Sequence, residues 1–322
     1  MFIGGLMSKK IAHILLLATA LLWGMNFVSL KYLSNVFPPY TLVFVKFGIA
    51  TLFLWSILLS KQKKGFPIKR LEKIDYKGII LTGIAAFVLY SYFQIFSFSY
   101  LSANLSALLC ALVPICSLLA EVLILKKKCS PITYVLSLLS LYGVYLVLDM
   151  KLGDFFSSTA IWGILLMMSA NITWVAYTMT TGHLQAKYGS LSSLTYQMTA
   201  GSIFLGLISI RDFAQAVNTL RVSDQAWLII LNLLFVGIGT SALAYLFYIS
   251  GMEVIGIQLS SLYINFIPVV TAIASYFIFK EHLTIHQLIG MVLVIGSIIF
   301  INKAEENHHQ KINNLKASYT IT

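Results

Sequence analysis

The stretch YTLVFVKFGIATLFLWSILLS, residues 40–60, decides the fold class. It holds 21 residues with one charge, at Lys46, and the polar run KQKKG follows it. An α-helix of about 20 apolar residues spans the hydrocarbon core of a bilayer. Backbone polar groups in lipid must be bonded within the protein, and these apolar residues do not alternate as barrel strands do. The stretch therefore predicts a transmembrane helix.

Similar apolar blocks recur along all 322 residues, of which 59% are hydrophobic and 10% charged. Soluble domains carry about 25% charged residues. The first block runs beyond signal-peptide length without a small-residue cleavage site, so we expect an uncleaved helix. The sequence predicts an all-α membrane protein with about ten transmembrane helices. The predicted spans are residues 11–33, 40–60, 78–98, 102–125, 131–149, 158–181, 191–210, 225–248, 256–279 and 284–302.

The net charge of +11 comes from basic residues that lie between the apolar blocks. If both termini are cytoplasmic, 16 of the 22 Lys and Arg residues fall inside, 5 fall outside, and Lys46 falls within a span. Basic residues favour the cytoplasmic side. We therefore predict a multi-pass protein of the cell inner membrane with both termini in the cytoplasm. This placement also argues against nucleic acid as a partner. Residues 1–10 are predicted to be a cytoplasmic extension and residues 303–322 a disordered cytoplasmic tail.

The two halves of the chain resemble each other. A shift of 154 residues aligns the later blocks and pairs Pro114 with Pro268, and a shift of 151 aligns the first two spans of each half. The second shift pairs Trp23 with Trp174 and Lys46 with Gln197. Five helices in each half place the second half in the membrane in the opposite sense. The sequence thus predicts two inverted repeats, over residues 11–149 and 158–302, a plan that recurs in transporters.

Several motifs resemble the EamA-type members of the drug/metabolite transporter superfamily over residues 11–302. They are ALLWGMNF at residues 20–27, the segment 262–268 followed by FKEHLT at 279–284, and Gly290 with Gly296. The chain differs where the family usually has Arg, at Lys46, and where it expects an acidic residue, at Lys127. The resemblance implies ten helices, a central cavity between helices 1, 3, 4, 6, 8 and 9, and transport of small organic metabolites, often amino-acid export.

Polar residues inside the spans must face protein or water, so they mark candidate binding positions. On the eighth span, Ser241, Tyr245 and Tyr248 share one helical face at α-helical spacing. Interhelical hydrogen bonding is the alternative role for each such residue. The predicted substrate-binding residues are Trp23, Asn26, Lys46, Tyr90, Gln94, Asn104, Asn171, Trp174, Tyr177, Tyr245, Tyr248, Gln258 and Asn265.

Charged residues and prolines suggest further roles. Lys46 is either a counter-charge for an anionic substrate group or a lysine that snorkels to the outer surface. Glu121 is a candidate for proton coupling, or an interfacial residue that meets the basic run 126–128. Pro114 and Pro268 are hinge candidates, with static bends as the alternative.

The sequence contains no catalytic or nucleotide-binding motif, and its six His and three Cys residues lack metal-site spacing. We therefore expect no enzyme activity, cofactor or metal. The predicted function is a secondary transporter or exporter of small amphipathic metabolites, with amino acids as the leading class, working by alternating access. One alternative is a carrier or exchanger of nucleotide-like or adenosyl-type metabolites; another is a membrane-embedded enzyme acting on lipid. The sequence is compatible with either a monomer or a homodimer.

The basic-residue bias gives a test of topology. In a chain whose native cysteines are replaced, Lys69→Cys should react with an impermeant maleimide only after the membrane is permeabilised. Asp154→Cys should react in intact cells. The reverse labelling pattern would contradict the predicted orientation.

Overall fold

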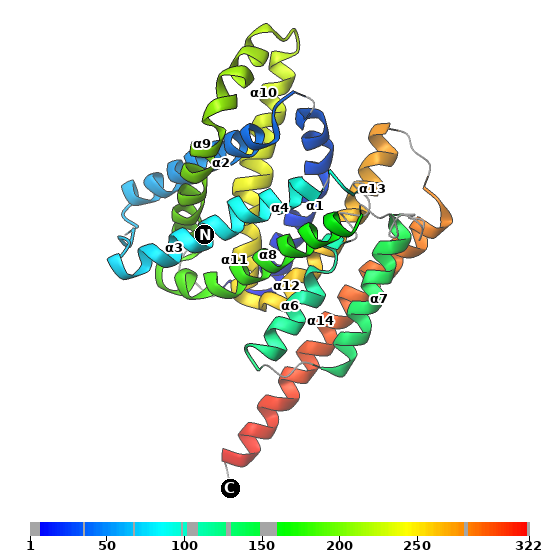
Figure 1. Cartoon of the computed structure of the whole chain (residues 1–322). Helices are drawn as coiled ribbons and strands as arrows, with labels where there is room; N and C mark the ends of the chain where they lie inside the picture. The colour runs from blue at the N-terminus through cyan, green and yellow to red at the C-terminus, as the bar shows by residue number, and fades with distance from the viewer. Residues whose placement is uncertain are drawn as a thin grey trace.

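A computed structural model of the chain describes residues 7–34, 36–66, 68–97, 99–101, 109–126, 130–148, 160–279 and 283–320 (Figure 1). The regular elements within these ranges are all helical, as the sequence predicted. The elements are α1 (Lys9–Ser34), α2 (Pro39–Lys63), η1 (Lys73–Asp75), α3 (Tyr76–Gly83), η2 (Ile84–Leu89), α4 (Tyr90–Ser97), α6 (Val113–Leu123), α7 (Pro131–Val147), α8 (Ala160–Tyr188), α9 (Ser190–Val222), α10 (Ala226–Leu234), η4 (Phe235–Leu243), α11 (Ala244–Ile255), α12 (Ile257–Leu262), η5 (Tyr263–Asn265), α13 (Phe266–Phe279) and α14 (Ile285–Thr320).

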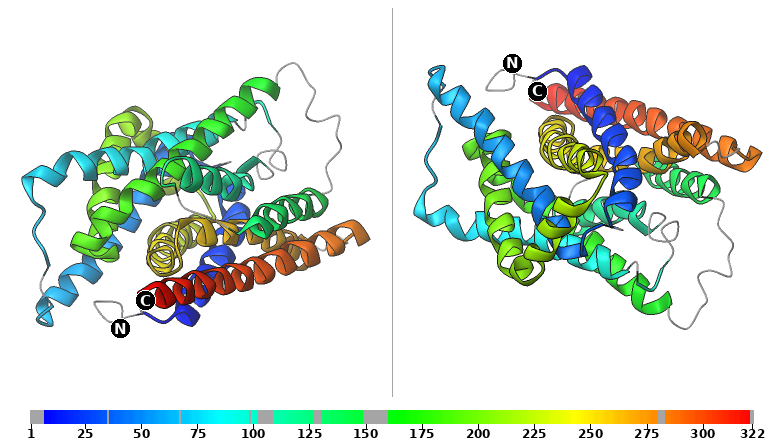
Figure 2. Two further views of the ribbon diagram at one scale, coloured as in Figure 1. Left: turned by 90° about the horizontal axis from the view of Figure 1, so that it is seen from below. Right: turned by 90° about the horizontal axis from the view of Figure 1, so that it is seen from above.

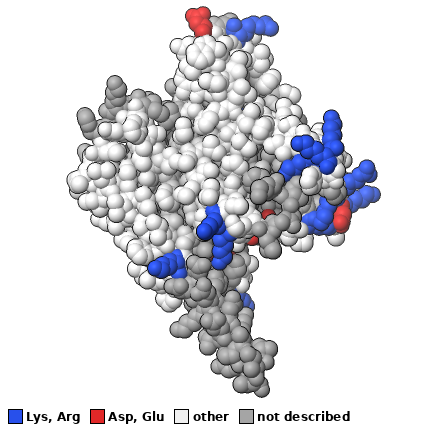
Figure 3. All heavy atoms as spheres, turned by 180° about the vertical axis from the view of Figure 1, so that it is seen from behind, with Lys and Arg blue, Asp and Glu red and all other residues white. Residues whose placement is uncertain are grey.

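Among the described residues, seven helical stretches are long and apolar enough to cross a membrane, and α6 and α7 are shorter apolar helices. The seven stretches are Pro39–Lys63, Lys73–Ser97, Ala160–Tyr188, Ser190–Ile210, Ala226–Ile255, Ile257–Ala274 and Ile285–Ala304. Large apolar side chains such as Leu52, Leu123 and Val292 are at least 70% exposed. Figure 3 shows a mostly uncharged face with Lys and Arg gathered in a few patches. An exterior of this kind suits contact with lipid.

Each predicted span overlaps a helical stretch, although part of the fourth, 102–125, lies outside the described residues. The count of ten crossings stays a prediction. Helix α14 continues to Thr320, which differs from the disordered tail predicted for residues 303–322. Extending an existing helix avoids the cost of nucleation, so polar residues can continue an apolar helix.

Two of the long stretches contain a π-helical segment, η2 and η4. A π-helix bonds residue i to i+5, and such turns are rare and frequent at functional sites. The 154-residue shift places residues 84–89 on 238–243, which lie within η4. The wide turns therefore occur at matching places in the two halves.

Contacts between the halves also join matched positions. The hydroxyl oxygens of Thr51 in α2 and Ser202 in α9 lie 2.9 Å apart, and these residues are 151 positions apart. A Cβ added to Gly83 would overlap the carbonyl oxygen of Gln197, also in α9. A Cβ added to Gly237 would lie 3.3 Å from the carbonyl oxygen of Lys46 in α2. Gly83 and Gly237 therefore let each half's third stretch approach the second helix of the other half.

Gln197 forms a buried polar cluster beside the Gly83 contact. Its Nε2 donates to Thr82 Oγ1 and Thr181 Oγ1, each at 2.9 Å, and the Gln197 side chain is fully buried. We call Thr82, Thr181 and Gln197 the glutamine clamp. Because its members come from α3, α8 and α9, the clamp fixes three helices to one another.

Helices α7 and α14 form a pair at one edge of the bundle (Figure 2). A Cβ added to Gly290 would lie 2.5 Å from the carbonyl oxygen of Gly143. Small residues let membrane helices pack at short distance. This pair thus lies beside the remaining helices, which surround the centre of the bundle.

The close contact at Gly83 predicts a loss of stability on substitution. Gly83→Ala should lower the free energy of unfolding by about 1–3 kcal/mol, because the added methyl group meets backbone. Gly182→Ala in α8 is the control, since a Cβ there has no neighbour within 4 Å. The measurement is the apparent Tm in detergent. An unchanged Tm for Gly83→Ala would show that α3 and α9 do not pack this closely.

Candidate functional site

A cavity of about 90 Å³ lies between the two halves of the bundle. Seven of the predicted binding residues line it: Trp23, Asn26, Lys46, Tyr90, Gln94, Trp174 and Tyr245. The other lining residues are Cys110, Ala111, Val113, Thr240, Ile264, Ile267 and Pro268. Of the described residues that line the cavity, Lys46 alone carries a charge. The site is therefore mostly aromatic and neutral, with a single cation.

Aromatic rings form one wall of the cavity. The Trp23 ring centroid lies 5.8 Å from that of Trp174, 5.4 Å from Tyr245 and 5.3 Å from Tyr248. The Tyr90 ring lies 5.5 Å from Trp174. The pairs of Trp23 with Trp174 and with Tyr245 meet edge to face, an arrangement that the ring quadrupole favours. The wall is thus held by ring packing between α1, α4, α8 and α11.

Hydrogen bonds orient the polar lining. Trp23 Nε1 donates to the Thr240 carbonyl oxygen at 3.0 Å, which joins α1 to η4. Thr240 Oγ1 donates to Asn26 Oδ1 at 2.8 Å. On the opposite side, Gln94 Nε2 donates to Tyr90 Oη at 3.2 Å. The polar groups therefore hold one another in place around an apolar body.

Five other predicted binding residues are buried and do not line the cavity: Asn171, Tyr177, Tyr248, Gln258 and Asn265. Asn171 Nδ2 donates to the Leu109 carbonyl oxygen at 2.7 Å, and Asn265 Nδ2 donates to Ser140 Oγ at 2.8 Å. These two residues make the interhelical bonds that were their alternative role. A substrate role for the five stays a prediction.

The remaining predicted positions have separate locations. Asn104 lies outside the described residues. Glu121 is buried in α6 and is not among the cavity-lining residues. Pro114 is buried near the start of α6, whereas Pro268 in α13 lines the cavity.

Sequence reasoning missed Thr240 and Cys110 as cavity-lining residues. The α-helical spacing selected Ser241, Tyr245 and Tyr248, but the π-helical segment changes the register before Tyr245. Thr240 and Tyr245 are separated by five residues and both line the cavity, whereas Ser241 is fully buried. The matching π-helical segments could have been found only from backbone geometry.

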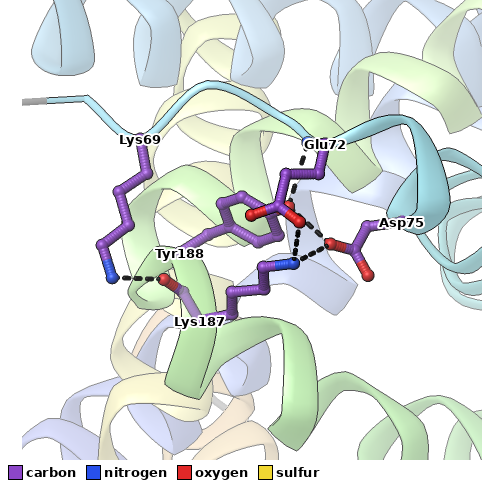
Figure 4. Close-up of polar contacts among 5 residues, drawn as sticks. All are labelled: Lys69, Glu72, Asp75, Lys187 and Tyr188. Atoms are coloured by element: carbon purple, nitrogen blue, oxygen red, sulfur yellow. Dashed lines mark hydrogen bonds and ion pairs between the residues drawn. The ribbon is translucent and has the colours of Figure 1, made fainter.

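A second polar group lies at the end of the bundle that holds the α2–α3 connection (Figure 4). Lys187 Nζ lies 2.6 Å from Glu72 Oε2 and 2.7 Å from Asp75 Oδ2. Tyr188 Oη donates to Asp75 Oδ2 at 2.6 Å, and Lys69 Nζ donates to the Lys187 carbonyl oxygen at 2.8 Å. We call these five residues the latch cluster. The cluster joins the first half to the end of α8.

The latch cluster and the cavity lie at different levels of the bundle. Thirteen residues of α8 separate Trp174 from Lys187, which corresponds to about 20 Å along the helix axis. Tyr177 lies one turn from Trp174 toward the latch cluster, and Thr181 of the glutamine clamp lies one turn further. Both side chains are fully buried. Buried aromatic and polar side chains therefore occupy the space between the cavity and the latch cluster.

The described residues contain no group of three or more His, Cys, Asp or Glu that could hold a metal ion. The arrangement instead offers a solute an aromatic wall, the two side-chain amides of Asn26 and Gln94, and one ammonium group.

Comparison with known proteins identifies the family. The EamA-like transporter family matches residues 10–149 and again residues 161–303. The chain is 28% identical to the uncharacterized transporter YyaM of Bacillus subtilis over 89% of this chain and 92% of that protein. It is 31% identical to the uncharacterized inner membrane transporter YhbE of Escherichia coli K12 over 52% of each chain.

A solved crystal structure shares the fold, with a TM-score of 0.76 and 17% sequence identity, over 93% of this chain and 99% of that chain. The family matches cover most of the 322 residues, and the apolar helices agree with a membrane-embedded fold. This chain is a multi-pass membrane protein that belongs to the EamA-like transporter family.

Proposed function

We propose that this protein is a secondary transporter of small amphipathic metabolites, with amino acids as the leading class, and that it works by alternating access. The observation that carries the proposal is the composition of the cavity wall. Trp23, Lys46 and Tyr90 come from the first half, and Trp174 and Tyr245 come from the second. A solute in the cavity contacts both halves, so rocking of one half against the other changes its access to each side.

The inverted-repeat plan is part of this proposal. The family matches the chain in two stretches of similar length. Matched positions meet across the centre of the bundle, as Trp23 does with Trp174 and Thr51 with Ser202. Reciprocal contacts of this kind are expected where two related halves pack around a two-fold axis. They support two inverted repeats with ten crossings, and the basic-residue bias supports termini in the cytoplasm of a cell inner membrane.

Closure at one end supports alternating access. The latch cluster and the buried layer above it occupy the end of the bundle that the positive-inside bias assigns to the cytoplasm. We propose that the latch cluster closes the cytoplasmic side and opens when the halves rock. Pro268 and the π-helical segments are the candidate bending points. Glu121 remains a candidate for proton coupling from outside the cavity wall.

The cavity chemistry favours amino acids over the alternatives. A nucleotide-like solute would carry several negative charges, and the described lining offers one cation. An enzyme acting on lipid would need clustered His or acidic residues, and the described cavity wall includes neither.

Uptake into proteoliposomes tests the function. At least one labelled amino acid should accumulate above protein-free vesicles, and Trp174→Ala should reduce the rate about tenfold through loss of aromatic contacts. Trp162→Ala is the matched control, because Trp162 is 62% exposed on the same helix α8. Uptake of nucleosides without amino acids would favour the alternative carrier. Equal rates for the two variants would argue against this cavity as the route.

Opening at the latch cluster gives a second test. In a cysteine-free chain, Thr181→Cys lies behind the latch cluster and should react slowly with a maleimide. Adding Lys187→Met should raise that rate on the order of fivefold, since a partly shielded ion pair contributes up to about 1 kcal/mol. Lys63→Met, an exposed lysine of α2, should leave the rate unchanged. If Lys187→Met also has no effect, the cluster does not control access.

A further inference from the structure

Lys46 has an unusual position in the cavity wall. It lies about two turns into α2, and its Nζ lies 4.7 Å from the centroid of the Phe47 ring. Among the described residues, none forms a hydrogen bond or an ion pair with Lys46 Nζ. The carboxylates of Glu72 and Asp75 are paired with Lys187 in the latch cluster. Lys46 is partly buried, and an ammonium group shielded from water is destabilised when it has no partner. The cavity wall therefore holds a cation that needs an anion.

At the matching position in the second half, the polar side chain has hydrogen-bond partners within the protein. Gln197 is paired with Lys46 by the repeat, and its amide is bonded to Thr82 and Thr181. Both backbones are in equivalent settings, because Gly83 packs on the Gln197 carbonyl and Gly237 packs near the Lys46 carbonyl. The glutamine clamp therefore satisfies its polar side chain entirely from within the protein.

The hydroxyl partners have no counterpart beside Lys46. The repeat pairs Thr82 of the glutamine clamp with Val236, and Thr181 with Leu30. Two hydrogen-bonding residues are thus replaced by two aliphatic ones, while a longer and charged side chain replaces Gln197. The partner of Lys46 must come from outside the protein. The cavity, which Lys46 lines, is the route by which such a partner can arrive.

We propose that Lys46 binds the carboxylate of the transported solute, and that the carboxylate is the group the site requires. This inference rests on the proposed transport function and names its substrate class. The solute's apolar body lies against Trp23, Trp174 and Tyr245. One cation in an otherwise neutral wall matches a monoanion, whereas a dianionic phosphate would leave an uncompensated negative charge.

The same charge distribution makes the amino group dispensable. The described residues of the wall include no carboxylate that could pair with an ammonium group. An amino acid and the corresponding acid without its amino group should therefore both bind. The amine that lacks the carboxylate is repelled by Lys46. The site thus selects organic acids, among which amino acids are one group.

The test uses three probes of nearly equal shape: 3-phenylpropionate, 3-phenylpropanamide and 3-phenylpropylamine. Binding to purified protein is measured by the change in tryptophan fluorescence, because Trp23 and Trp174 line the cavity. The acid should bind about tenfold more tightly than the amide, as expected for one charge-assisted hydrogen bond. The amine should bind more weakly than the amide.

Three variants separate a counter-charge from a structural lysine. Lys46→Gln should bind the acid and the amide equally, with affinity for the amide unchanged. Lys46→Arg should keep the preference for the acid. Lys63→Gln, on the same helix and exposed, should behave as the parent does. Melting temperatures of all variants report whether each is folded.

The outcomes distinguish this inference from the transport proposal. The role of Lys46 is overturned if the parent protein binds none of the probes, or binds the acid no more tightly than the amide. It is also overturned if Lys46→Gln still binds the acid more tightly than the amide. Amino-acid uptake into vesicles would then still stand on its own result. If the acid binds through Lys46 but no carboxylate crosses the membrane, the site survives and the transport function fails.

Discussion

The close approach of helices at two glycines is the constraint on which the bundle depends. Gly83 packs on the carbonyl of Gln197, and Gly237 packs near that of Lys46, so each half's π-helical stretch rests on the second helix of the other half. A side chain at either glycine would force the helices apart. The cavity, the aromatic wall and the position of Lys46 all follow from this pair of crossings, because they fix where α2 and α9 lie.

The two ends of the bundle differ in how closely their side chains are packed. On the side of the α2–α3 connection, the latch cluster is partly exposed at the surface, and the glutamine clamp and Tyr177 form buried layers behind it. Beyond Trp174 the layers give way to the cavity. A buried polar side chain needs hydrogen-bond partners, and the glutamine clamp supplies them for Gln197. The matching region near Lys46 lacks those partners, which suits a surface that exchanges solutes.

The sequence was sufficient for the fold class, because apolar blocks of spanning length have few physical solutions. It also located much of the cavity, since Tyr90 with Gln94 and Trp23 with Asn26 keep regular α-helical spacing. It failed where geometry departs from that spacing: the π-helical segment η4 brings Thr240 into the cavity lining, whereas Ser241 is not part of it. It could not assign the hydrogen bonds of Asn171 and Asn265 either, because their partners, Leu109 and Ser140, are distant in sequence.

An ammonium group inside the bundle has an electrical consequence. Moving one elementary charge through a potential of 100 mV changes the energy by about 2.3 kcal/mol. If α2 carries Lys46 through part of the field when the halves rock, reorientation of the empty protein depends on the membrane voltage. A bound monoanion cancels that charge, so the loaded protein reorients without regard to voltage. A single lysine in α2 would then let the membrane potential act on the return step alone and set the direction of net flow.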